Sequence, residues 1–413
     1  MRLLLQDRSA RIFLSQSVLS TFGDRFMFLA AGIWVRVLTG SNAEAGLTFF
    51  FLVLPEVVVS PLAGLVVDRV RRQPLLIACQ AAGAVVVMLL VLVRNRDQVW
   101  LIWSVMVAYG TIATFISAAK SALLVTIVPR ELLGDANGVL NTMAEGLRLV
   151  TPLVGAGLFT LAGGAVVAEL DALTFVIAAG ALLRLQVLEP EPEPRREHWL
   201  AETAAGFRHI WHTIPLRQVM LALLLVLAVV GFLETAFFAV VTNGLHRPAS
   251  FVGVLISIQG VGAIVGGLSA APAMRRCLET RLTAIGIFAV GLGSGICVAP
   301  AFVAGILPMA VVVVAALLVG FGLPWLVVGS STLIQRRTPL SLQGRVDTAY
   351  GLLFGAFQTA SIGGGALLIA VFGYVALLIA VGGASLLAAG YLMTRAEVAP
   401  LAAEELDSAM VGS

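Results

Sequence analysis

The sequence has little charge. Only 12% of its 413 residues are Asp, Glu, Lys or Arg, whereas 59% are apolar, and the mean hydropathy is +1.01. One water-soluble core cannot hide so much apolar surface. Runs of about 20 apolar residues, each long enough to cross a hydrocarbon layer about 30 Å thick, recur along nearly the whole chain. The composition therefore leaves little room for a soluble domain and predicts a protein that crosses a membrane many times.

Lysine and cysteine are scarce as well. The only lysine, Lys120, follows Ala-Ala instead of the Gly that precedes the lysine of a phosphate-binding loop, which argues against ATP hydrolysis by this chain. The sequence has no zinc, haem or nucleophile-elbow pattern either, so we expect no metal, no cofactor and no enzymatic activity. The cysteines Cys79, Cys277 and Cys297 are odd in number, which indicates packing residues and not a disulfide framework.

Twelve apolar segments predict an all-α membrane protein with twelve transmembrane helices in two six-helix halves. The expected helices are 12–37, 46–67, 74–94, 98–118, 138–161, 165–187, 217–242, 250–272, 282–303, 306–330, 345–371 and 375–394. The expected parts are an N-terminal half 1–188, a cytoplasmic linker 189–216, a C-terminal half 217–395 and a cytoplasmic tail 396–413. The linker opens with Glu-Pro-Glu-Pro-Glu-Pro and continues with an amphipathic run around Trp199, Phe207 and Trp211.

Basic residues are distributed unevenly between the predicted loops. If the N-terminus is inside, twenty of the 26 Lys and Arg residues lie on the cytoplasmic side and four lie on the opposite side. Arg25 and Arg148 lie within the membrane. Because cytoplasmic loops carry an excess of Lys and Arg, we expect both termini to be cytoplasmic. The net charge of +3 then reflects membrane topology, and we expect no nucleic-acid partner.

The two predicted halves repeat at an offset of 210 residues. The matched positions are Pro129–Asn137 with Pro339–Asp347, Gly155 with Gly365, Phe22 with Phe232, and Asp24 with Glu234. Several coincidences at one offset indicate a duplication. Since each half has an even number of helices, we expect parallel repeats related by an axis along the membrane normal.

The loop between the second and third predicted helices carries a recognisable motif. It reads Gly-Leu-Val-Val-Asp-Arg-Val-Arg-Arg over residues 64–72. With Gly64, Asp68, Arg69 and Arg72 it matches Gly-x-x-x-Asp-Arg-x-x-Arg, the cytoplasmic signature of the major facilitator superfamily, which the chain resembles over essentially its whole length. We expect Gly64 to allow a close helix approach and Asp68 to pair with arginines or cap a helix, forming a cytoplasmic gate. A purely topogenic basic loop is the alternative.

Within that superfamily the chain is similar to drug exporters of the macrolide-efflux and enterobactin-exporter type. The similarity lies in Phe22-Gly-Asp24, in Asp171-Ala-Leu-Thr-Phe175 and in the loop 336–345. It implies alternating-access export of a small amphipathic drug, antibiotic or siderophore across the bacterial inner membrane, coupled to protons. The partners it implies are the substrate, protons and membrane lipid, and we expect a monomer. A flippase for lysophospholipid or another lipid, and a membrane receptor that does not transport, are the alternatives.

The exporters' fifth-helix pattern, Gly-x-x-x-Gly-Pro-x-x-Gly-Gly, is only partly present. It survives around Pro152 and Gly155, whereas Leu147 and Thr151 depart from it. Small residues here would let the helix pack closely, and Pro152 would let it bend. Close packing without any role in antiport explains the pattern equally well.

Seven ionisable residues are predicted to lie at membrane depth, where charge is costly and usually faces a cavity or a partner. They are Asp24, Arg25, Glu56, Glu145, Arg148, Asp171 and Glu234. Asp24 is the first candidate for proton coupling, Glu56 the second, and Glu234 is the repeat partner of Asp24. A desolvated acid can hold a proton and release it when the cavity opens to water. The alternatives are a permanent pair of Asp24 with its neighbours or with Arg148, and mutual neutralisation of Glu145 and Arg148.

Overall fold

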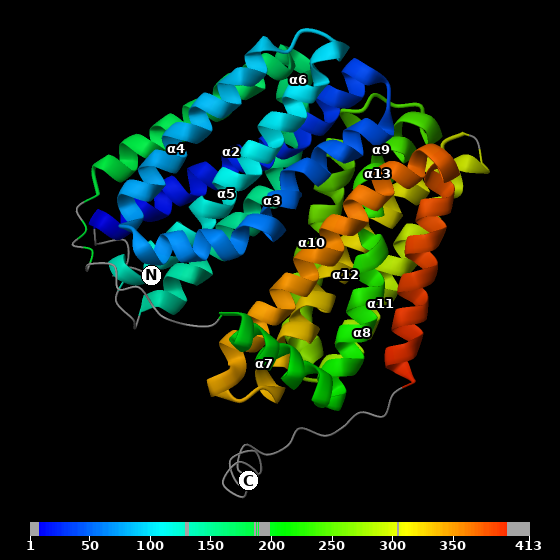
Figure 1. Cartoon of the computed structure of the whole chain (residues 1–413). Coiled ribbons are helices and arrows are strands. Elements are labelled where there is room, and N and C mark those ends of the chain that lie inside the picture. The colour runs from blue at the N-terminus through cyan, green and yellow to red at the C-terminus, as the bar shows by residue number, and fades with distance from the viewer. Residues whose placement is uncertain are drawn as a thin grey trace, which may run out of the picture. The chain divides into compact units, whose positions relative to one another are not determined.

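The computed structural model describes residues 8–128, 132–185, 187, 189, 199–303 and 305–394, and in this part all regular structure is helical (Figure 1). The N-terminal helices are α2 (Arg8–Thr39), α3 (Asn42–Arg69), α4 (Arg72–Met88), α5 (Val99–Ile127) and α6 (Leu133–Leu183). They are followed by α7 (Trp199–His212), α8 (Ile214–Val230), α9 (Phe232–Ala239), α10 (Phe251–Met274), α11 (Glu279–Ile296), α12 (Leu307–Arg337) and α13 (Leu340–Met393). Short helices η1 (Leu89–Leu92), η2 (Arg96–Gln98), η4 (Val240–Gly244) and η5 (Ala299–Ala301) extend several of them. The predicted all-α class is confirmed.

Ten helical segments of the described chain are long and apolar enough to cross a membrane. Two of the helices, α6 and α13, are broken by a glycine with non-helical backbone angles. Gly163 has φ 80° and ψ 173°, and Gly373 has φ 72° and ψ 170°. These breaks fall in the gaps between predicted helices, at 162–164 and 372–374. The predicted count of twelve therefore requires each of these two helices to cross the membrane twice.

The broken helices support the internal duplication. Gly163 and Gly373 lie 210 residues apart, which is the offset that relates the two halves of the sequence. Both glycines occupy a backbone region that is essentially closed to residues with a side chain. The same unusual conformation at equivalent positions indicates that both repeats turn at this point in the same way.

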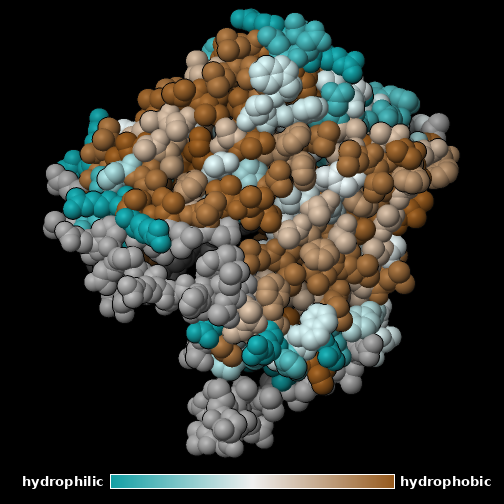
Figure 2. All heavy atoms as spheres, in the orientation of Figure 1, coloured by the Kyte–Doolittle hydropathy of each residue, from teal (hydrophilic) through white to brown (hydrophobic). Residues whose placement is uncertain are grey.

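The helix surfaces are suited to lipid. Exposed apolar side chains occur along most of the long helices, and Leu268 and Leu387 are 76% and 71% exposed. Figure 2 shows an apolar surface over α3, α4 and α5, with polar residues gathered toward helix ends. A water-soluble helix would confine apolar residues to one stripe, whereas these helices are apolar on both their packed and their exposed sides.

The described chain forms two compact units. Unit 1 comprises Met1–Arg196, Glu234–Ser257 and Ile362–Val371, and unit 2 comprises Glu197–Leu233, Ile258–Ser361 and Phe372–Ser413. These units follow packing, whereas the predicted halves follow the sequence repeat, and the division into halves stays a prediction. The core of unit 1 joins α2, α4, α5 and α6 through large side chains such as Phe26, Met106 and Phe175.

Unit 2 has its own apolar core and carries α7. The core joins α8, α11, α12 and α13 through residues that include Leu223, Ile287 and Leu333. The predicted amphipathic stretch of the linker is confirmed as helix α7, which buries Ile210 in this core and exposes Phe207 and Trp211. The imidazole of His209 also contacts the main-chain oxygen of Arg337 at 3.1 Å. The linker helix is therefore part of unit 2.

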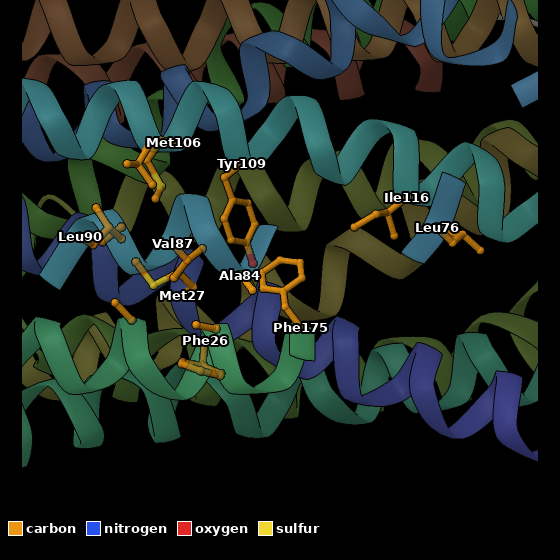
Figure 3. Close-up of a cluster of buried hydrophobic side chains, with 14 of the residues drawn as sticks. Phe26, Met27, Leu76, Ala84, Val87, Leu90, Met106, Tyr109, Ile116 and Phe175 are labelled. Atoms are coloured by element: carbon orange, nitrogen blue, oxygen red, sulfur yellow. The ribbon is translucent and has the colours of Figure 1, made fainter. Parts of the chain in front are cut away.

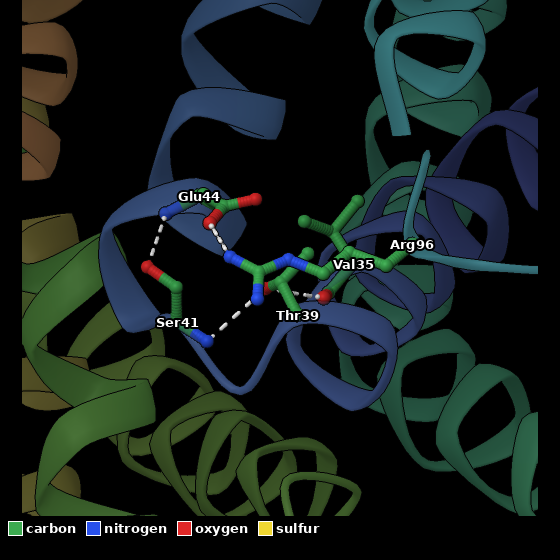
Figure 4. Close-up of polar contacts among 5 residues, drawn as sticks. All are labelled: Val35, Thr39, Ser41, Glu44 and Arg96. Carbon is green, nitrogen blue, oxygen red and sulfur yellow. Dashed lines mark hydrogen bonds and ion pairs between the residues drawn. The ribbon is translucent and has the colours of Figure 1, made fainter. Parts of the chain in front are cut away.

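The turn between α2 and α3 shows how a helix begins in this chain (Figure 4). Gly40, with φ 72°, lies between the helices, and Ser41 caps α3 by accepting a hydrogen bond from the Glu44 N–H at 3.2 Å. The Glu44 carboxylate faces the Arg96 guanidinium at 3.5 Å, although the Arg96 side chain is 66% exposed. The cap satisfies an otherwise unpaired N–H, whereas the ion pair is largely screened by solvent.

Replacing Gly373 by alanine should lower the free energy of unfolding by about 1–3 kcal/mol, because a side chain is strained at this backbone conformation. Gly390→Ala, in the same helix and with open space around the new Cβ, should change it by no more than about 1 kcal/mol in either direction. Denaturant unfolding in detergent micelles measures both values. Equal effects of the two substitutions would contradict the role given to Gly373.

Replacing Ser41 by alanine should destabilise the protein by about 1 kcal/mol through loss of the α3 cap. Arg96→Gln should cost less, about 0–1 kcal/mol, because its ion pair is exposed. The same unfolding measurement compares the two variants, and a larger loss for Arg96→Gln would show that the ion pair and not the cap holds this turn.

Candidate functional site

A cavity of about 680 Å³ lies among α2, α3 and α5 of unit 1. Its polar lining includes Asp24 and Arg25 from α2, Glu56 from α3, and Tyr109 and Thr114 from α5. Apolar side chains such as Phe28 and Leu52 complete the wall. A cavity of this size, apolar with a few polar groups, is typical of sites for small molecules.

Asp24 is held in the cavity wall by a hydrogen bond between helices. The Tyr109 hydroxyl donates to Asp24 Oδ1 at 2.8 Å, which joins the middle of α2 to α5. Figure 3 shows the Tyr109 ring reaching from α5 toward Phe175 of α6, and the two ring centroids lie 5.6 Å apart in an edge-to-face arrangement. The positive charges of Lys120 and Arg25 also act on the Asp24 carboxylate. A phenol and two cations thus stabilise this acid at membrane depth.

Asp171 lies directly behind Asp24. Its side chain is completely buried, and the hydroxyl of Thr174 lies 3.4 Å from Asp171 Oδ1. Gly23, next to Asp24 on α2, makes this approach possible, because a Cβ at this position would collide with Thr174 and lie 2.6 Å from Asp171 Oδ1. The carboxylate of Asp24 and the phenol of Tyr109 both interact with Asp171. The structure therefore brings two predicted acids to one point between α2, α5 and α6.

The other predicted ionisable residues are placed differently. Arg25 and Glu56 line the cavity with Asp24, and the Glu56 side chain is exposed to it. Glu234, the repeat partner of Asp24, is half-buried on α9 and does not line this cavity. The side chains of Glu145 and Arg148 lie outside the described part of the structure, so the predicted pairs that involve Arg148 stay predictions.

The 64–72 motif departs from expectation at Gly64, which lies within α3. Among the described residues, none would lie within 4 Å of a Cβ at this position, so they show no close helix approach at Gly64. The reason is that Gly64 borders the open cavity. Arg69 is exposed, and the side chain of Asp68 lies outside the described part of the structure.

A different acid caps α4. The Glu189 carboxylate accepts hydrogen bonds from the backbone N–H groups of Arg72 and Gln73 at 2.6 and 2.8 Å. The Gln73 side chain in turn donates to the carbonyl oxygens of Leu182 and Leu185. A carboxylate at a helix N-terminus satisfies free N–H groups and opposes the positive end of the helix dipole. The end of the 64–72 motif is thereby tied to the chain that follows α6.

The fifth-helix pattern lies at a close helix packing contact. A Cβ at Gly155 would lie 2.8 Å from the Phe26 carbonyl oxygen of α2, and one at Gly253 of α10 would lie 2.6 Å from the Pro152 carbonyl oxygen. Pro152 lies inside α6. Small residues here allow close approach between helices of unit 1, as their pattern predicts.

Sequence reasoning missed Tyr109 and Glu189. Tyr109 had one available signal: it is one of only four tyrosines, and a tyrosine inside an apolar helix needs a partner for its hydroxyl. Glu189 is one of three glutamates in an alternating Glu-Pro run, and no local feature distinguishes it from the other two. Among the described residues no cluster of three or more His, Cys, Asp or Glu side chains is arranged to hold a metal ion.

Replacing Gly23 by alanine should destabilise the protein by about 1–3 kcal/mol, because the added methyl group overpacks the contact with Thr174 and Asp171. Gly64→Ala is the matched control, because its Cβ would enter open space. Thermal unfolding in detergent, together with the yield of monodisperse protein, compares the two variants. If Gly23→Ala is as stable as Gly64→Ala, the close contact between α2 and α6 is wrong.

Comparison with known proteins places the chain among membrane transporters. The sequence model of the Major Facilitator Superfamily matches residues 13–364. The enterobactin exporter EntS of Escherichia coli O127:H6 (strain E2348/69 / EPEC) is 25% identical over 349 residues, which are 81% of this chain and 80% of that exporter. EntS of Citrobacter koseri is 26% identical over the same shares of the two chains.

Solved structures agree on the fold. The crystal structure of a bacterial homologue of the iron transporter ferroportin, in an inward-facing state, matches with a TM-score of 0.70 and 17% identity over 94% of this chain and all of that one. The nucleoside transporter NupG matches with a TM-score of 0.75 and 13% identity over 94% of this chain and 98% of that chain. The superfamily sequence model spans most of the chain, and the all-helical fold agrees with it. The chain therefore belongs to the major facilitator superfamily and is a multi-pass membrane transporter, not an enzyme.

Proposed function

We propose that this transporter exports a small amphipathic compound across the bacterial inner membrane in exchange for protons. The observation that carries the proposal is the position of Asp24 in the wall of the cavity, bonded to Tyr109. Ionisable groups at membrane depth are costly and mark substrate or proton pathways. Because Asp24 lines the cavity and is also bonded to Tyr109, its protonation can change when a substrate enters the cavity.

The direction of transport is supported by sequence relatives. The matched relatives are exporters of enterobactin, and they share about a quarter of their residues with this chain over four fifths of its length. The excess of basic residues in alternate predicted loops supports cytoplasmic termini.

The cavity chemistry suits a substrate with both apolar and polar parts. Phe28 and Leu52 offer apolar surface, while Asp24, Arg25 and Glu56 present charges of both signs. A substrate with a cationic group, or with hydroxyls that donate hydrogen bonds, can pair with the Asp24 carboxylate once that acid has lost its proton. Binding of substrate and binding of a proton then compete at Asp24, and this competition couples their movement in opposite directions.

The cytoplasmic gate has a role in this mechanism. Glu189 ties the N-terminus of α4 to the chain after α6, so the 64–72 motif is anchored at one end. We assign Arg69 and Asp68 of this motif to contacts that form and break as the transporter changes state. The fifth-helix residue Gly155 provides close packing against α2, and Pro152 lies at the contact with α10.

The experiment uses purified protein in liposomes with an imposed pH gradient, and follows uptake of enterobactin, ethidium and erythromycin. Wild-type protein should transport at least one of these compounds only when the gradient is present. Asp24→Asn should lower the gradient-driven rate by about tenfold or more, equivalent to about 1.4 kcal/mol of lost coupling. Asp97→Asn, an exposed acid in η2, is the matched control and should keep the wild-type rate.

Other results of this experiment would favour a different coupling residue or a different function. If Asp24→Asn keeps full dependence on the gradient while Glu56→Gln loses it, the coupling role belongs to α3. Movement of a fluorescent lysophospholipid, with none of the three compounds transported, would replace export by lipid flipping. Binding of these compounds without any transport by wild-type protein would favour a receptor.

A further inference from the structure

Asp171 is a buried acid that is not part of the cavity wall. Its side chain has no exposed surface, and it does not line the cavity. Among the described residues, Asp171 Oδ2 makes no hydrogen bond. An ionised carboxylate only accepts hydrogen bonds, and burying it without donors costs several kcal/mol, of the order found for other unpaired buried charges. The position therefore needs a neutral acid or a donor.

The nearby hydroxyl groups already donate elsewhere. The Thr174 hydroxyl donates to the main-chain oxygen of Asp171 at 2.8 Å and lies farther, 3.4 Å, from Oδ1. The Tyr109 hydroxyl donates to Asp24 at 2.8 Å. Each hydroxyl has one hydrogen to give. Asp171 Oδ1 therefore shares both hydroxyls with other acceptors, and Asp171 Oδ2 has no donor among the described residues.

Charges around the two acids are distributed unequally. Lys120 of α5 and Arg25 of α2 both stabilise the Asp24 carboxylate. Among the described residues, the charge that acts on Asp171 is that of Asp24, which is of the same sign. On α4 the neutral side chain of Gln80 is buried, and its Nε2 lies 3.5 Å from Ser20 Oγ of α2. Two carboxylates that share a site do not both ionise readily.

We propose that Asp171 carries a proton in the resting transporter and that Asp171, Tyr109 and Asp24 form one proton-binding unit. The proposal rests on the proposed function, because it names the group from which the exchanged proton comes. The Asp171 hydroxyl, once protonated, can donate to the Tyr109 oxygen, whose own hydrogen already points to Asp24. Three side chains from α6, α5 and α2 then form a continuous hydrogen-bonded chain that ends at the cavity.

Proton transfer along this chain is balanced. The Asp171 O–H bond breaks as its hydrogen moves to the Tyr109 oxygen, and the phenolic O–H bond breaks as that hydrogen moves to Asp24 Oδ1. Tyr109 is neutral before and after, Asp171 becomes ionised and Asp24 becomes protonated. Asp24 then releases the proton to water in the cavity. Asp171 is thus a proton store, and Tyr109 connects it to the surface on which substrate binds.

Infrared spectroscopy of the purified protein near neutral pH tests the proposal. Wild-type protein should show a carbonyl-stretch band of a protonated carboxyl group that shifts to lower frequency in D₂O. The band should be absent from Asp171→Asn and retained in the control Asp97→Asn. Tyr109→Phe should shift the band, because the acid loses its hydrogen-bond acceptor. A wild-type spectrum without such a band, or one unchanged in Asp171→Asn, would overturn the proposal.

Transport measurements distinguish a failure of this proposal from a failure of the proposed function. In the liposome assay Asp171→Asn should lower gradient-driven transport by about tenfold or more, as Asp24→Asn does. Gradient-driven transport that Asp171→Asn leaves unchanged would remove Asp171 from the proton path while export itself stands. A band assigned to Asp171, together with a rate of wild-type transport that does not depend on the pH gradient, would support the proton site and contradict the exchange of substrate for protons. If Asp171→Asn misfolds, Tyr109→Phe decides the test, because a band that this variant leaves unshifted would overturn the proposal.

Discussion

The hydrogen bond from Tyr109 to Asp24 is the interaction on which the interior of unit 1 depends. An acid at membrane depth has no bulk water to solvate it, and without a donor it costs several kcal/mol. Asp24 obtains its donor from α5, so α2 and α5 must meet at this level. Gly23 then allows α6 to approach α2 closely, so that Asp171 of α6 lies beside Asp24 and Tyr109, and Phe175 beside Tyr109. One polar contact in this way fixes the positions of three helices.

The same contact connects structure with transport. Asp24 and Tyr109 both line the cavity, whereas Asp171 lies behind them in the core. A ligand that enters the cavity meets the first two groups and affects the third only through them. In the proposed mechanism, substrate and proton therefore compete for one hydrogen-bonded unit whose cavity end is Asp24. This arrangement also keeps the proton store away from open water, where a carboxyl group would readily ionise.

Much of the architecture was predictable from the sequence, because apolar length and repeat period are properties of the chain itself. The offset of 210 residues anticipates the equivalent helix breaks at Gly163 and Gly373. The depth of Asp24 and Asp171 also follows from the sequence. Their partnership does not, because Tyr109 lies 85 residues from Asp24 and the contact depends on how each helix is rotated. For the same reason, a signature motif indicates a gate at Gly64 but does not reveal that Glu189 caps the helix that follows it.

The central claim is that substrate and proton compete for the unit built on Asp24. It is tested most directly by adding whichever compound the liposomes transport to purified protein in weakly buffered detergent solution, and following proton release with a pH-sensitive dye. The account predicts that wild-type protein releases protons in proportion to the compound bound, and that Asp24→Asn releases none. Binding of the compound to wild-type protein with no release of protons at any pH near neutrality would contradict it.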